Sequence, residues 1–224
     1  MTARRVVLCR HGRTVHNHAG VWQGQLDTDL DDTGRAQAVV AASALARLAA
    51  GMPSPSGAGR GPVVVVSSDL RRAADTAAVV ADRLGVEVQL DKRLREIDVG
   101  RWQGLDREEI VAAGMGEDLA RWLRDEEDSR AGGAERRRDV AERGAGAVRE
   151  HAANLADGGL LVVVSHGAIL RATALALLGL RIVPSRWLGT LRNCHWAELA
   201  PGEPNWRLLA YNAGGEPDGA PSAW

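Results

Sequence analysis

The chain has 224 residues, of which 45% are hydrophobic and 25% are charged, and its formal net charge is -1 at pH 7. This composition is typical of one globular domain of ordinary α/β size, and the near-neutral charge gives no support for binding to nucleic acid or to an anionic membrane. No apolar run approaches the ~20 residues of a membrane span, and the N-terminus has no signal-peptide core. We therefore expect a cytoplasmic protein with no nucleic-acid partner and no membrane partner.

The first predicted element is a buried strand at residues 6–9, and Arg10, His11 and Gly12 follow it directly. Gly12 permits a tight turn out of the sheet. Arg10 and His11 are then expected at the carboxyl edge of a strand, where open α/β sheets bind their ligands. Cys9 in this strand is expected to be a small buried apolar residue without a disulfide partner.

Strands and helices alternate along the rest of the chain. After a polar loop at residues 14–32, the elements expected in chain order are a helix at 33–50, a strand at 63–67, a helix at 69–84, an edge strand at 86–90, a short helix opened by a capping box at 106–109, a helix at 117–126, a helix at 135–156, a strand at 160–165, a helix at 168–178 and a hairpin of strands at 196–199 and 206–211. Val39 is expected on the buried apolar face of the helix at 33–50, and Gly85 is expected to end the helix at 69–84. The alternation of strands and helices predicts a mostly parallel sheet with helices on both faces, a three-layer α/β/α sandwich.

The predicted domain covers most of the chain. A single domain is expected over residues 1–212, and the short helices at roughly 101–135 are expected to form a cover over its site. The segment at 51–62 is rich in Gly, Pro and Ser and predicts a surface linker. The segment at 213–224 has a similar composition and predicts a disordered tail.

The strand at 160–165 repeats the pattern of the first one, because it ends in His166 and Gly167. The carboxyl ends of parallel strands meet at one edge of a sheet, so His11 and His166 are expected to lie close together. Two imidazoles beside Arg10 favour a phosphate-binding site. A pair of core histidines satisfied by the backbone is the alternative, and the matching strand-end positions argue against it.

These residue types suit transfer of a phosphoryl group. An unprotonated imidazole is a nucleophile toward phosphorus, so His11 is the candidate nucleophile. Fixed positive charge helps the transfer, and Arg10, one arginine of the pair at 71–72 and a protonated His166 are expected to supply it. Glu96, in the loop after a strand, is the best candidate to protonate the leaving oxygen.

Five motifs in this order resemble those of the histidine phosphatase superfamily, which has the phosphoglycerate mutase-like fold. The family patterns are RHGxTxxN, matched at 10–17; LTxxGxxQA, resembled at 30–38 with Asp31 in place of Thr; SxLxRAxxTA, matched within 67–77; LxExxxGxWEG, resembled at 94–104 with Gln103 in place of Glu; and the second histidine, matched within 164–167. The resemblance implies a phosphohistidine on His11 and an acid at Glu96. It also implies a phosphate pocket of Arg10, Arg72 and His166, with no metal and no other cofactor.

Two segments bear on the substrate. Residues 22–28 and 67–73 resemble the matching segments of actinobacterial glucosyl-3-phosphoglycerate phosphatases, which implies hydrolysis of a small sugar or glycerate phosphate. Asn17, Gln23 and Gly24 are then expected to contact the substrate, together with the arginines and His166. One departure concerns the pocket wall: residues 132–135 read Gly-Gly-Ala-Glu, where many members have Gly-Gly-Glu-Ser.

Two other functions remain open at this stage. True phosphoglycerate mutases usually carry inserted segments and further basic residues, which this chain lacks, so hydrolysis by a metal-independent phosphatase is favoured. A phosphate-binding regulatory domain without catalysis is the second alternative, and the intact set of His11, Glu96 and His166 argues against it. A small phosphorylated molecule is the expected partner, and a homodimer is a further expectation.

Several other side chains have two readings. His16 and His18 are expected at the rim of the site. Trp22, Trp102 and Trp122 either line a sugar-binding rim or pack in the core, and core packing is the commoner outcome for tryptophan. The arginines between 136 and 149 predict a solvated helix face.

Overall fold

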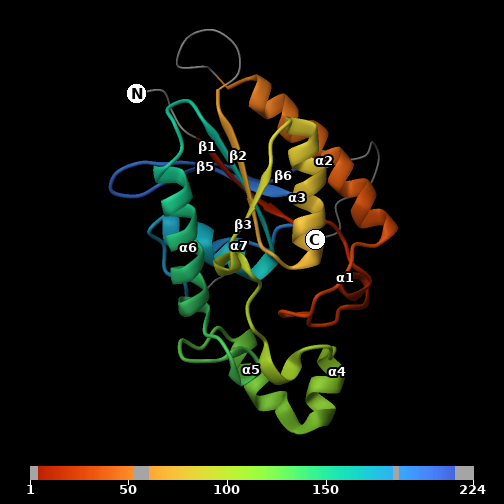
Figure 1. The fold of residues 1–224 in the computed structure, drawn as a ribbon. Helices are drawn as coiled ribbons and strands as arrows, with labels where there is room; N and C mark the ends of the chain where they lie inside the picture. The colour runs from red at the N-terminus through yellow and green to blue at the C-terminus, as the bar shows by residue number, and fades with distance from the viewer. Residues whose placement is uncertain (1–4, 53–60, 184–186, 215–224) are drawn as a thin grey trace.

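The structure is a computed structural model of the chain, and it describes residues 5–52, 61–183 and 187–214. Within these residues, six strands form one sheet in the order β3-β2-β4-β1-β5-β6 (Figure 1). The strands are β1 (Arg5–Arg10), β2 (Val63–Ser67), β3 (Val88–Leu90), β4 (Leu160–Ser165), β5 (Trp196–Ala200) and β6 (Arg207–Ala213). β1 to β4 are parallel, and β5 and β6 are antiparallel to their neighbours. The predicted mostly parallel sheet and its C-terminal hairpin are therefore confirmed.

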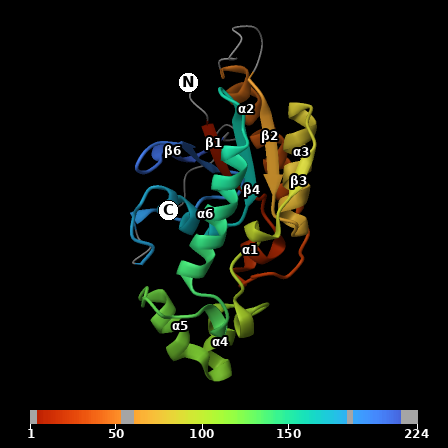
Figure 2. The same ribbon diagram turned by 60° about the vertical axis from the view of Figure 1, so that its left-hand side comes forward.

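Helices cover both faces of this sheet (Figures 1 and 2). One face carries α2 (Asp32–Ala50) and α3 (Arg71–Leu84), and the other carries α6 (Arg137–Ala153) and α7 (Gly167–Leu177). The α/β/α sandwich is confirmed by this arrangement. A further short helix, α1 (Val15–Ala19), lies where the sequence predicted only a loop.

The strands are continuous apolar runs because a parallel sheet is buried on both faces. Within β1, Val6 and Leu8 pack in the core beside α6 and α7, whereas Val7 and Cys9 pack beside α2 and α3. Cys9 is fully buried and free, as expected.

Register places the ends of three strands side by side. Arg10 at the end of β1 pairs with Ser165 of β4, and Ser67 of β2 pairs with Val164 of the same strand. The residues that follow these strands therefore leave the sheet at one edge, which is where the sequence places its two histidines.

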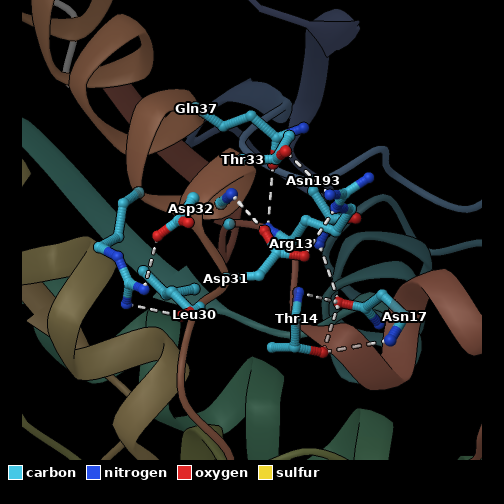
Figure 3. Close-up of polar contacts among 12 residues, drawn as sticks. Arg13, Thr14, Asn17, Leu30, Asp31, Asp32, Thr33, Gln37 and Asn193 are labelled. Carbon is cyan, nitrogen blue, oxygen red and sulfur yellow. Dashed lines mark hydrogen bonds and ion pairs between the residues drawn. The ribbon is translucent and has the colours of Figure 1, made fainter.

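The start of α2 differs from the predicted one. Its N-cap is Asp31, whose side chain accepts the Gly34 N–H at 2.7 Å and pairs with Arg13 at 2.8 Å (Figure 3). Val39, predicted to face the core, is 57% exposed. The buried face is formed by Leu45 and by small residues, namely Gly34, Ala38, Ala41, Ala42 and Ala49. Small side chains let this helix lie close to the sheet.

A separate helical lobe lies beyond the carboxyl edge of the sheet (Figures 1 and 2). It contains α4 (Arg107–Ile110), a π-helical segment (Val111–Met115) and α5 (Gly116–Leu123), with short 3₁₀ turns at Gly100–Trp102 and Ala131–Gly133. The predicted capping box of α4 is present between Asp106 and Glu109. A third 3₁₀ turn, Lys92–Leu94, precedes the lobe, and its Leu94 packs in the core of the sheet. The lobe shares a buried cluster with α6 and α7; its own members include Ile97, Val99, Trp102, Ile110, Leu119 and Trp122.

Some predictions fall on parts of the chain that the structure does not describe. Most of the linker at 51–62 lies there, as does the tail from residue 215 onward. Residue 213, predicted to begin the tail, is the last residue of β6. Among the described residues, no helix is both long enough and apolar enough to span a membrane.

Candidate active site

The loop that carries His11 packs directly on the start of α2. A Cβ atom on Gly12 would lie 2.4 Å from the Gly34 carbonyl oxygen, and one on Gly34 would lie 2.0 Å from the Arg13 carbonyl oxygen. Glycine is therefore required at both positions by this close approach. The Gly12 N–H also donates to the Thr76 hydroxyl of α3 at 3.1 Å. The loop after β1 is thus fixed to both helices on that face.

His11 and His166 lie against each other at the ends of β1 and β4. Their ring centroids are 5.1 Å apart, and both side chains are buried. His11 Nδ1 lies 2.7 Å from the Gly12 carbonyl oxygen; because a carbonyl only accepts, Nδ1 carries the proton and Nε2 keeps its lone pair. His166 Nε2 lies 2.8 Å from the Ser68 hydroxyl. When that hydroxyl donates, His166 Nδ1 carries the ring's proton.

Three buried nitrogens around these rings have no hydrogen-bond partner within the described part of the chain. They are Arg10 Nε, Arg72 Nε and His166 Nδ1. Arg10 Nη1 donates to the Leu191 carbonyl at 2.8 Å, and the two Nη atoms of Arg72 donate to the carbonyls of Leu26 and Gly24 at 2.6 and 2.8 Å. Each guanidinium is therefore held through one or both of its Nη atoms, and its Nε–H has no partner within the described part of the chain. Since an unpaired buried donor is costly, these atoms indicate a binding site for anionic oxygens.

Electrostatics favour neutral imidazoles in this site. Burial, together with the Arg72 and Arg10 guanidiniums, lowers the pKa of His11 well below its ordinary value of 6.5. Burial, then Arg72 and the His11 ring, also lower the pKa of His166 well below 6.5. A neutral His11 is the nucleophilic form. The expectation of a protonated His166 is wrong for this site without substrate, where the guanidiniums carry the positive charge. Burial lowers the pKa of Arg72 to about 10, which leaves it charged near neutral pH.

Two amide side chains in the pocket have their oxygens already engaged. Asn17 Oδ1 accepts from the Thr14 N–H at 3.2 Å and from the Asn193 amide at 3.3 Å (Figure 3). Gln23 Oε1 accepts from the hydroxyls of Thr14 and Thr28 at 3.0 and 2.8 Å. Both amides line the pocket, so their NH₂ groups are the atoms available to a ligand.

Glu96 is held by backbone N–H groups. Its Oε1 accepts from Ile97 and Ile169 at 2.9 and 3.0 Å, and its Oε2 accepts from Ala168 at 3.1 Å. Residues 168 and 169 lie in the first turn of α7, directly after the second histidine. A carboxylate has about four lone-pair positions, and the position that remains on Oε2 can hold a proton. This is the atom from which an acid would act.

Arg143 and Glu135 hold the backbone that carries Glu96, a role that the sequence did not predict. Arg143 donates to the carbonyl of Glu96 and to that of the preceding residue at 3.1 and 2.6 Å, and it pairs with Glu135 at 3.0 Å. Glu135 also accepts the Asp98 N–H at 2.7 Å. Arg143 therefore does not belong to a solvated helix face. The altered segment at 132–135 still supplies a carboxylate at this wall.

The pocket above these groups has a volume of about 270 Å³. Its described lining includes the predicted residues Arg10, His11, Asn17, Gln23, Gly24, Arg72 and Glu96. His166 lies beneath this surface, because it is fully buried and contacts the His11 ring. Among the described residues, no group of three or more His, Cys, Asp or Glu side chains is placed to hold a metal ion.

The tryptophans and one arginine of the lobe divide between pocket and core. Trp22 lines the pocket, whereas Trp102 and Trp122 are buried at 0% and 5% exposure. The Arg137 guanidinium lies 3.3 Å from the Trp122 ring centroid and pairs with Asp125. Arg137 is therefore a buried residue of the lobe, and its assignment to a solvated face is wrong.

Comparison with known proteins identifies the family. The family model described as the histidine phosphatase superfamily, branch 1, matches residues 6–214. The chain belongs to the histidine phosphatase superfamily.

Relatives within this superfamily are similar over nearly the whole chain. The glucosyl-3-phosphoglycerate phosphatase of Mycolicibacterium vanbaalenii is 42% identical over 230 residues, which covers 95% of this chain and 96% of the relative. The enzyme of that name from Mycobacterium tuberculosis is 40% identical, with the same coverage. A solved structure of the mycobacterial glucosyl-3-phosphoglycerate phosphatase in complex with VO₃ matches with a TM-score of 0.82 at 40% identity, covering 95% of this chain and 100% of that one.

These similarities confirm the predicted family and fold. They also show that this histidine phosphatase is an enzyme that hydrolyses phosphoric monoesters, and this function fits better than the mutase or the inactive binding domain.

Proposed function

We propose that this histidine phosphatase hydrolyses glucosyl-3-phosphoglycerate through a phosphohistidine formed on His11. Two independent facts support the proposal. Relatives that bear the name of this activity align over 95% of the chain. The floor of the site also presents unpaired buried donors beside an imidazole whose lowered pKa keeps it neutral, which suits a phosphoryl group.

In the first step, the phosphoryl group lies between His11 and His166. Its oxygens accept hydrogen bonds from Arg10 Nε, Arg72 Nε and His166 Nδ1, the three unpaired buried nitrogens. The lone pair of His11 Nε2 attacks phosphorus, and the bond from phosphorus to the ester oxygen breaks. Glu96 Oε2 gives its proton to the departing oxygen.

In the second step, water releases the phosphoryl group. Glu96 is now a carboxylate and takes a proton from the water as its oxygen attacks phosphorus. The bond from phosphorus to His11 Nε2 breaks, inorganic phosphate leaves and the imidazole is neutral again. The donors on the floor hold the phosphoryl oxygens in both steps, so one arrangement serves the whole cycle.

The observation that carries this proposal is the convergence of three unpaired buried nitrogens on the pair of rings whose centroids are 5.1 Å apart. The same donors would hold any phosphate monoester, and the specific substrate rests on the named relatives.

Turnover of a substrate panel tests the proposal. Release of inorganic phosphate is measured from glucosyl-3-phosphoglycerate, 3-phosphoglycerate and phosphoserine, with and without excess chelator. We expect the highest kcat/KM for the glucosylated ester and no loss with chelator. A higher kcat/KM for another ester would reassign the substrate, and isomerisation of 3-phosphoglycerate would indicate a mutase. A cytoplasmic location and a homodimer stay predictions.

A further inference from the structure

The wall of the catalytic pocket must contact the alcohol that the reaction releases. Above the phosphoryl-binding floor, its described lining includes His16, Gly20, Val21, Trp22 and Val99. None of these five residues is a lysine or an arginine. This part of the pocket therefore suits a leaving group that is recognised by its shape and its hydroxyl groups.

Trp22 is a rigid part of this wall. Its backbone N–H donates to the Leu105 carbonyl at 2.9 Å, and its backbone carbonyl accepts from the Gly104 N–H at 2.8 Å. Its ring meets that of Trp102 at a centroid distance of 5.3 Å and an interplanar angle of 68°. An edge-to-face contact of this kind covers at most one face of the Trp22 ring, and the residue also lines the pocket.

Buried aromatic residues of the lobe restrict the orientation of the Trp22 ring. Trp102 is fully buried, and its ring meets that of Trp122 at 6.2 Å. The Arg137 guanidinium in turn covers Trp122. Because buried aromatic pairs have few alternative packings, this series of contacts gives Trp22 one orientation before substrate arrives.

His16 is the polar member of the same wall. Its Nδ1 is buried and has no hydrogen-bond partner among the described residues. The short helix that carries it is held by the capping box between Thr14 and Asn17. A buried polar nitrogen without a partner is costly, so an oxygen of a bound ligand would be favourable there.

We propose that Trp22 and His16 form a leaving-group subsite for a pyranose ring. The apolar C–H face of the sugar packs on the indole, and a sugar oxygen forms a hydrogen bond with His16. The inference rests on the proposed function and names the residues that recognise the glycosyl part of its substrate. Neither residue touches the phosphorus, so the subsite acts on selectivity among esters.

The test compares two esters that differ by the sugar, glucosyl-3-phosphoglycerate and 3-phosphoglycerate. The variants are Trp22→Leu, Trp22→Phe and His16→Gln. The matched control is Trp187→Leu, because Trp187 is 61% exposed and is not part of the pocket lining. The measured quantity is the ratio of kcat/KM for the glucosylated ester to that for 3-phosphoglycerate.

We expect Trp22→Leu to lower this ratio about 10-fold, mainly through KM, and Trp22→Phe to restore most of it. His16→Gln lowers the ratio about 3-fold, the loss of one neutral hydrogen bond, and the control leaves it unchanged. An unchanged ratio in Trp22→Leu overturns the proposal, as does an equal loss on both esters that Trp22→Phe does not restore.

Failure of the proposed substrate gives a different result. A wild-type enzyme without preference for the glucosylated ester refutes that substrate. The subsite is then tested by the ratio of kcat/KM for glucose 6-phosphate to that for glycerol 3-phosphate. If Trp22→Leu lowers this ratio, the sugar subsite stands without the proposed substrate; if the ratio does not change, both proposals fail.

Discussion

The floor of the site and the helical lobe are built in different ways. The floor consists of side chains at strand ends that are buried within the sheet and its helices, with His11 at 2% and Arg72 at 1% exposure. The lobe has no strand in the sheet and is held by a tryptophan-containing cluster that it shares with α6 and α7. The floor meets the phosphoryl group, which every phosphate monoester has. The wall of the pocket, formed by residues within 16–24 and by Ile97 and Val99, is expected to meet the alcohol, which differs from one ester to another.

This difference separates rate from selectivity. A change on the floor is expected to lower turnover of all esters by a similar factor, because the lost interaction acts on phosphorus. A change that reaches the lobe is expected to affect esters unequally. This separation would be contradicted if a change on the floor affected esters unequally, or if a change that reaches the lobe affected all esters equally.

The largest effect is expected from His11→Ala. Loss of the nucleophile should lower kcat at least about 1000-fold for every ester tested. The fold is expected to persist, because the loop after β1 is held by the backbone of Gly12 and its contact with Gly34 and not by the His11 side chain. Phosphate release and circular dichroism measure the two effects, and substantial turnover by the folded variant would exclude His11 as the nucleophile.

The next effect is expected from Arg72→Lys, with a loss of about 100-fold in kcat/KM for all esters. The planar guanidinium can donate to the two carbonyls and to a phosphoryl oxygen at the same time, whereas the ammonium group of lysine cannot reproduce these three hydrogen bonds. Arg71→Lys is the matched control, since Arg71 is exposed and pairs with Asp29. Equal losses in the two variants would show that the position of Arg72 on the floor has no special importance.

A smaller and selective effect is expected from Arg143→Gln, which frees the loop of Glu96. The kcat/KM of an alkyl phosphate should fall about 10-fold, whereas that of p-nitrophenyl phosphate should fall much less, because nitrophenolate leaves without help from an acid. Arg149→Gln, an exposed position on the same helix, is the control. Losses of the same size on both substrates would indicate a general structural role for Arg143.

The smallest signal concerns protonation of His11. Because its pKa is lowered well below 6.5, its ring should remain neutral at pH 6.5, where an ordinary histidine is half protonated. The unfolded chain gains this proton first as the pH falls, so the free energy of unfolding should decrease below pH 6.5. NMR of ¹³C-labelled histidine follows the ring, and the signal absent from His11→Ala identifies it. A half-protonated His11 at pH 6.5 would contradict the buried site.

Much of the fold follows from local sequence patterns. Continuous apolar runs predicted the buried strands, and capping residues predicted α4 and the end of α3 at Gly85. The error at Val39 arose because four alanines, with Gly34 and Leu45, form the buried face of α2. The helix α1 was missed because it has five residues, none of them buried.

The site could be predicted only in part. Arg10, His11 and His166 follow strand ends, so topology alone places them at one edge of the sheet. Arg143 and Arg137 were read as solvated because sequence does not reveal which face of α6 meets the Glu96 loop or Trp122. The available signal for the Arg143 contact was Glu135, which stands one position later than the glutamate of the usual Gly-Gly-Glu-Ser segment.

The most direct test of the account is to trap the intermediate. The enzyme is mixed with substrate, quenched in base within its first turnover and digested, and the peptides are analysed by mass spectrometry under conditions that preserve phosphohistidine. The account predicts one phosphoryl group on His11, which disappears as inorganic phosphate forms. Phosphate on another residue, or turnover without any phosphorylated enzyme, would contradict it.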